Sequence, residues 1–131
     1  MEKENQNIEL EDILALEKIA KRKKESSAKK EIEWLIETLK SSLNPVNVED
    51  NALQKYAGNY SDRLVTFENG KLYYQRKDRQ KYELIPMSED LFRLKDLEVF
   101  RIKFEKDKSG MVTGLTGLYS DGHSDKSIRT N

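Results

Sequence analysis

The sequence contains no cysteine, and this absence excludes disulfide bonds, thiol catalysis and cysteine-ligated metal sites. It has only one histidine and two prolines. No apolar run approaches the ~20 residues that a membrane-spanning helix needs. Basic and acidic residues number 24 each, so no excess of positive charge favours nucleic-acid binding. A chain of 131 residues fits one domain, or a small domain with an appendage.

The sequence does contain eleven aromatic residues: one Trp, six Tyr and four Phe. Nearly all of them fall in short runs in which apolar and polar residues alternate, and this composition argues against disorder. From Tyr56 onward these runs recur at intervals of about ten residues, a spacing typical of an antiparallel meander or barrel.

The clearest run is a hairpin over residues 64–76, with Asn69-Gly70 between its two strands. Asn and Gly tolerate positive φ at both turn positions, which makes this pair the strongest short-range hairpin signal. A two-residue loop predicts that Glu68 lies opposite Lys71, Phe67 opposite Leu72 and Val65 opposite Tyr74. Val65, Phe67, Leu72 and Tyr74 then share the buried face, and a Glu68–Lys71 ion pair is expected on the other face.

The same alternation predicts further strands over residues 56–60, 81–86, 91–94, 99–105, 111–119 and 124–129. Pro86 is expected to end its strand or to mark an edge. Gly114 and Gly117 are expected to mark bulges or close approaches. The predicted total is seven or eight short antiparallel strands.

Helical periodicity precedes the strands, over residues 8–24 and 28–43. The joint at residues 25–27 favours two helices packed as a hairpin, although a single long helix is the alternative. Asn44-Pro45 ends the second helix, and residues 44–52 are predicted to be a linker that leads into a short turn at residues 52–55. The predicted fold class is α+β, with a helical hairpin over 1–43 and an up-and-down β-barrel over 53–131.

Several segments resemble the region that follows tail-specific-protease-like peptidases in Bacteroidetes-type bacteria. The segments are Asn44-Pro-Val-Asn-Val, Leu53-Gln-Lys-Tyr-Ala-Gly-Asn-Tyr60, Phe67-Glu-Asn-Gly-Lys-Leu-Tyr-Tyr-Gln-Arg76, Lys81-Tyr-Glu-Leu-Ile-Pro-Met-Ser-Glu-Asp90, Phe100-Arg-Ile-Lys-Phe-Glu105 and Val112-Thr-Gly-Leu-Thr-Gly-Leu-Tyr-Ser-Asp-Gly122. They are similar to lipocalin-like domains of unknown function found after beta-lactamase-like serine hydrolases.

The resemblance implies a non-catalytic accessory domain, extracytoplasmic, whose partner is a hydrolase domain. Its motifs are strand and turn patterns, so they carry over no catalytic residue, cofactor or metal ligand. His123, beside the Asp121-Gly122 turn, could act as a base with Asp121 or Asp125, but a solvated turn histidine is preferred. We therefore predict that the chain is not an enzyme.

Two sets of side chains are candidates for binding. The inward aromatic residues could line a pocket for an apolar ligand or peptide: Phe67, Tyr74, Tyr82, Phe92, Phe100 and Phe104. Core packing is the preferred interpretation, since eight short strands enclose little more than their own side chains.

The second set is expected to face outward and could form a protein-docking face for the hydrolase partner or a homodimer: Tyr56, Tyr73, Arg76, Arg101 and Tyr119, with Arg79 nearby. Scattered exposed positions are an equally weighted alternative.

Overall fold

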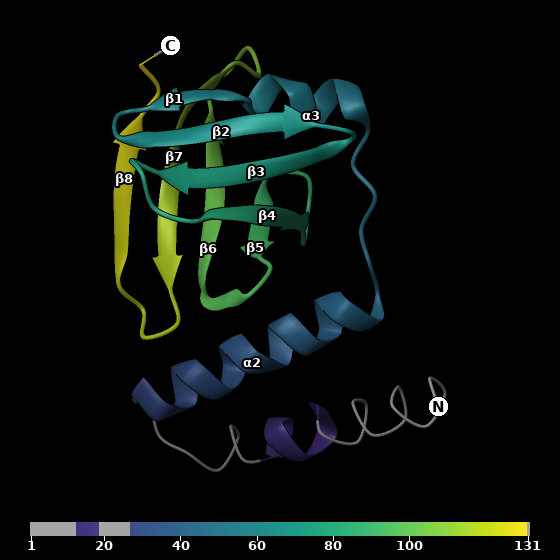
Figure 1. Cartoon of the computed structure of the whole chain (residues 1–131). Helices are drawn as coiled ribbons and strands as arrows, with labels where there is room; N and C mark the ends of the chain where they lie inside the picture. The colour runs from purple at the N-terminus through teal and green to yellow at the C-terminus, as the bar shows by residue number, and fades with distance from the viewer. Residues whose placement is uncertain (1–12, 19–26, 131) are drawn as a thin grey trace. The chain divides into compact units, whose positions relative to one another are not determined.

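A computed structural model describes residues 13–18 and 27–130 of the chain (Figure 1). These residues form two compact units, a helical unit that contains the described residues up to Pro45 and also Ser120–Gly122, and a sheet unit that contains Val46–Tyr119 and the residues from His123 onward. Each unit is described by itself below.

The helical unit contains α2, Ser27–Leu43, and a helical segment over residues 13–18. Ile13 and Ile36 are buried against each other, and Leu16, Ile32, Leu39 and Leu43 pack around them. Lys40 also forms an ion pair with Glu17 at 3.2 Å. The two segments thus pack as predicted, while the rest of the helix predicted over 8–24 lies outside the described residues.

The hairpin has the predicted register. β2, Arg63–Glu68, pairs with β3, Lys71–Arg76, and Val65 lies opposite Tyr74 as expected. Asn69 has φ of 52° and Gly70 has φ of 81°, so both turn residues adopt the left-handed conformation that this turn requires.

The predicted Glu68–Lys71 ion pair is wrong, because each residue pairs with the next strand instead. Glu68 pairs with Lys81, and Lys71 pairs with Glu83 at 3.8 Å. Lys81 and Glu83 belong to β4, which adjoins β3 and brings an oppositely charged side chain near each of them.

Eight antiparallel strands follow one another in a single sheet, in the order of the chain. Besides β2 and β3 they are β1 Gly58–Tyr60, β4 Lys81–Pro86, β5 Leu91–Leu94, β6 Leu97–Lys106, β7 Val112–Tyr119 and β8 Ser124–Ile128. The sheet curls until it is nearly closed into a barrel (Figure 1). Thr130, just after β8, donates its backbone N–H to the carbonyl of Asn59 in β1 at 2.9 Å. The up-and-down architecture is thus confirmed.

The stretch before β1 differs from the prediction. Residues 50–56 form a helix, α3 Asp50–Tyr56, where a linker to residue 52 and a short turn were expected. Leu53 and Tyr56, one helical turn apart, are both buried, and α3 contacts β2 and β3. Packing of this apolar side offsets the weak helix-forming tendency of so short a segment.

One part of the barrel interior is filled by a four-ring cluster of Tyr56, Tyr60, Phe92 and Phe104, each at most 1% exposed. Tyr56 stacks on Phe104 with ring centroids 4.2 Å apart, and Phe92 meets both rings edge-on. Tyr56 also donates its hydroxyl to the carbonyl of Glu89 at 2.7 Å. Here the expectation that inward rings form a core is confirmed.

Candidate functional site

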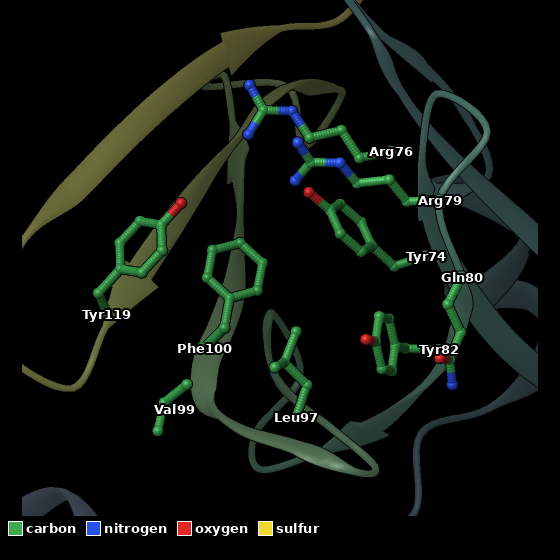
Figure 2. Close-up of a pocket in the computed structure, with 9 residues that line it drawn as sticks. All are labelled: Tyr74, Arg76, Arg79, Gln80, Tyr82, Leu97, Val99, Phe100 and Tyr119. Carbon is green, nitrogen blue, oxygen red and sulfur yellow. The ribbon is translucent and has the colours of Figure 1, made fainter.

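The other part of the barrel interior holds a cavity of about 330 Å³, which we call the aromatic cavity (Figure 2). It lies wholly within the sheet unit. Its walls come from β3, β4, β6, β7 and the loop after β3: Tyr74, Arg76, Arg79, Gln80, Tyr82, Leu97, Val99, Phe100 and Tyr119.

Strand register brings the rings of this cavity together. Tyr74 lies opposite Tyr82 in the β3–β4 pair, and Phe100 lies opposite Tyr119 in the β6–β7 pair. The ring of Phe100 lies 4.9 Å from that of Tyr119 and 5.7 Å from that of Tyr74, so it joins the two sides. Val99 stands at the rim with 57% of its surface exposed.

Gly117 of β7 makes room for this arrangement. A Cβ atom at Gly117 would come within 2.8 Å of the Phe100 ring and 2.6 Å of the Asp125 carboxylate. The absence of a side chain therefore lets the ring and the carboxylate lie directly over the β7 backbone, which confirms the predicted close approach.

Buried charges lie beside the rings. Arg63, only 3% exposed, lies opposite Arg76 in the β2–β3 pair, so two arginines occupy neighbouring inward positions. Arg63 forms an ion pair with Asp125 at 2.7 Å, and Arg76 donates to Asp62 at 3.1 Å. Tyr119 donates its hydroxyl to the second oxygen of Asp125 at 3.1 Å. Each inward arginine thus has its own carboxylate.

The pKa values of these groups follow from the contacts. Partial burial acts to raise the pKa of Asp125, but the hydrogen bond and charge of Arg63 outweigh it and hold that pKa below its usual range. The hydrogen bond from Arg76 likewise lowers the pKa of Asp62. Desolvation raises the pKa of Tyr74, and desolvation together with the bond to Asp125 raises that of Tyr119. Both tyrosines therefore stay neutral hydroxyl donors at ordinary pH.

Arg79 differs from the inward arginines. Its side chain is exposed at the rim and forms no ion pair within the part of the chain that the structure describes. Its backbone is held on both sides, since its N–H bonds the carbonyl of Arg76 at 3.1 Å and its carbonyl accepts from Gln75 at 2.8 Å. The loop backbone is therefore held beside the cavity, and the exposed Arg79 side chain extends from it.

The six residues expected to form a pocket divide into two groups. Tyr74, Tyr82 and Phe100 line the aromatic cavity. Phe92 and Phe104 are buried in the four-ring cluster, and Phe67 packs half-buried against the core. Sequence alternation placed all six inward, but it could not show which part of the interior is filled.

The residues expected to form a docking face are not one surface. Arg76 and Tyr119 line the aromatic cavity, whereas Tyr73 is on the opposite face of β3, near Lys81. Tyr56 and Arg101 are buried, at 1% and 3% exposure, so the expectation that both are exposed is wrong. Tyr56 is turned inward because it ends a helix rather than beginning a strand.

Sequence reasoning missed the inward pair of Arg63 and Asp125. The sequence did contain a signal for Arg63. It stands two residues before Val65 and four before Phe67, and this period-two spacing assigns all three side chains to the inward face. His123, in contrast, lies beside Tyr119 with ring centroids 5.3 Å apart.

Comparisons with protein-family models and with curated proteins find no match. Over the residues that the structure describes, no helix is long and apolar enough to cross a membrane. The same residues contain no cluster of three or more His, Asp or Glu side chains arranged to hold a metal ion. The peptidase-associated origin implied by the resemblance stays a prediction.

Proposed function

We propose that the sheet unit is a non-catalytic binding module that takes one small, largely apolar ligand in the aromatic cavity. The observation that carries this proposal is the unequal filling of the barrel. The four-ring cluster closes one part, while Tyr74 and Phe100, each 5% exposed, and the half-buried Tyr82 border a cavity. Tyr74 and Phe100 thus belong to the core and also present one side to the cavity.

The dimensions support a small ligand. A volume of about 330 Å³ is at the lower end of the roughly 300–1,000 Å³ typical of ligand sites. Apolar walls with a few polar groups at one side are also typical of such sites. A docking role has less support, because the residues expected to form that face are divided between the cavity, the core and the opposite face of the sheet.

An accessory role beside a hydrolase domain stays a prediction from the resemblance, and a ligand-binding module is compatible with it. A module of this kind would hold or present a small molecule for the partner domain. The experiment below tests the binding activity without requiring the partner.

The test is a fluorescence titration of the full chain with the uncharged dye phenylnaphthylamine, preceded by native mass spectrometry to detect any copurified ligand. We expect saturable binding of one dye per chain. Val99→Trp, at the exposed rim, should weaken binding at least about tenfold by covering the cavity. Leu64→Trp is the matched control, since Leu64 is an exposed apolar strand residue that does not line the cavity. Equal binding by both variants, or none by the wild type, would contradict the proposal.

A further inference from the structure

The cationic groups of the aromatic cavity are gathered on one side. Figure 2 shows the guanidinium groups of Arg76 and Arg79 on the same side of the cavity as the hydroxyl of Tyr74. Leu97 and Val99 lie on the other side, away from these groups, and Phe100 lies between the two sides. The cavity is therefore amphipathic, with one cationic end and one apolar end.

The cationic end carries one uncompensated positive charge. Arg76 is neutralised by Asp62 at 3.1 Å, through its Nε atom. Arg79, between Asp78 and Gln80 in the chain, forms no ion pair among the described residues. The hydroxyls of Tyr74 and Tyr82 make no hydrogen bond within the same residues, so both can bond a ligand. A monoanion would balance the charge, whereas a dianion would leave an excess of negative charge.

The apolar end is short. The four-ring cluster occupies the interior beyond it, and Phe92 and Phe104 have 0% and 1% of their surface exposed. An extended acyl chain would find no continuing channel within the barrel and would have to leave the cavity past the exposed Val99. A compact ring fits better, because Tyr82 and Phe100 offer aromatic faces and edges against which a planar ring can pack.

Resting on the proposed function, we infer that the ligand is a compact aromatic carboxylate. Its carboxylate lies against Arg79 and the free nitrogens of Arg76, with the Tyr74 hydroxyl as a third donor. Its ring lies between Tyr82 and Phe100. A guanidinium forms two parallel hydrogen bonds with a planar carboxylate, which gives this head group its geometric preference.

The test is isothermal titration calorimetry of the full chain with naphthoate and with naphthamide, two ligands of similar shape that differ in charge. We expect naphthoate to bind about tenfold more tightly, and the preference to weaken at high salt because Arg79 is exposed. Arg79→Gln should reduce the preference to about twofold or less. Lys77→Gln is the matched control: it removes a cation two residues away that does not line the cavity, and it should leave the preference unchanged.

Each of the following alternative outcomes would disprove a specific part of the proposal. Equal binding of naphthoate and naphthamide, with both abolished by Val99→Trp, would disprove the anionic ligand and leave the binding module standing. If Arg79→Gln and Lys77→Gln reduced the preference for naphthoate equally, the preference would reflect the general positive charge of the loop and not a specific site. Decanoate binding as tightly as naphthoate would disprove the compact ring. If neither naphthalene compound bound in a way that Val99→Trp weakens, the proposed function itself would fall.

Discussion

At the scale of single residues, the most unusual feature is Arg63, a guanidinium with 3% exposure inside a small barrel. Its Nη2 atom bonds Asp125, but the described residues offer no hydrogen-bond acceptor to its Nε and Nη1 atoms. Removing one partner of a buried ion pair destabilises a protein more than the pair itself stabilises it, because a charge is left uncompensated. The Arg63–Asp125 pair should therefore be sensitive to substitution.

We expect Asp125→Asn to lower the free energy of unfolding by about 2 kcal/mol, a value reduced from that of a fully buried pair because Asp125 is 35% exposed. Urea denaturation measures this directly. Asp78→Asn, in the exposed loop after β3, is the matched control and should change stability by less than about 0.5 kcal/mol. An Asp125→Asn variant as stable as the wild type would show that Arg63 does not depend on this carboxylate.

Tyr60 is expected to make the free energy of unfolding depend on pH in the alkaline range. Burial raises the pKa of this fully buried hydroxyl to about 12 from its ordinary value of 10. The raised pKa means that the folded state favours the neutral hydroxyl. The contribution of Tyr60 to stability is therefore fully present below pH 10 and is lost as the pH rises through about 12. We expect the free energy of unfolding to fall over that interval by up to about 2 kcal/mol from this group alone.

Tyr60→Phe tests the assignment. The hydroxyl donates to the carbonyl of Tyr56 at 2.7 Å, so its removal should cost about 1 kcal/mol at pH 7. The decline in stability between pH 10 and pH 12 should become shallower. Tyr73→Phe, on the opposite face of the sheet, should keep the wild-type slope. Identical slopes in the wild type and both variants would assign the alkaline loss to other groups.

At the scale of elements, the hairpin of β2 and β3 depends on its turn. Gly70 has φ of 81°, a conformation that costs a residue with a Cβ roughly 1–2 kcal/mol. Gly70→Ala should therefore destabilise the protein by about 1 kcal/mol, as measured by thermal unfolding. Gly70→Asn is the comparison, and it should cost less because Asn tolerates left-handed φ. Equal stability of both variants and the wild type would show that the turn is not needed for the register.

Helix α3 shows how an element can depend on its surroundings. Alone, seven residues would not form a stable helix in water. Two side chains on one side, Leu53 and Tyr56, are buried against the sheet and offset the cost of ordering the helix. The Tyr56 ring then stacks on Phe104 and completes the four-ring cluster that fills one part of the barrel interior.

At the scale of the whole molecule, each unit has its own apolar core. Every residue of the larger core belongs to the sheet unit, and every residue of the smaller core belongs to the helical unit. We therefore expect a fragment of residues 46–131 to fold by itself, with cooperative urea unfolding and a near-UV circular dichroism spectrum of ordered tyrosines. A fragment of residues 1–45, whose described residues include few buried side chains, should not unfold cooperatively. Failure of the larger fragment to unfold cooperatively would show that the sheet unit needs the helices.

The sequence by itself determined the strands, their order and the register of the hairpin. These features are local, since alternation with period two assigns Val65 and Tyr74 to one face and the Asn69-Gly70 turn sets which residues lie opposite. The second helix and the end of the helical unit near Asn44-Pro45 depend on local signals of the same kind.

Only the tertiary structure decided how the barrel interior is divided. Alternation assigns Phe100 and Phe104 alike to the inner face and both are buried in the core, yet only Phe100 also lines the aromatic cavity. The difference arises from the curvature of the sheet and from α3, which brings Tyr56 against Phe104 and leaves Phe100 beside open space. Inward arginines and their carboxylates likewise meet only when β2, β3 and β8 are brought together, because Arg63 and Asp125 are 62 residues apart in the chain. Period-two alternation shows which face of the sheet a side chain occupies. The distance between two side chains on strands far apart in the chain depends on the geometry of every strand that lies between them.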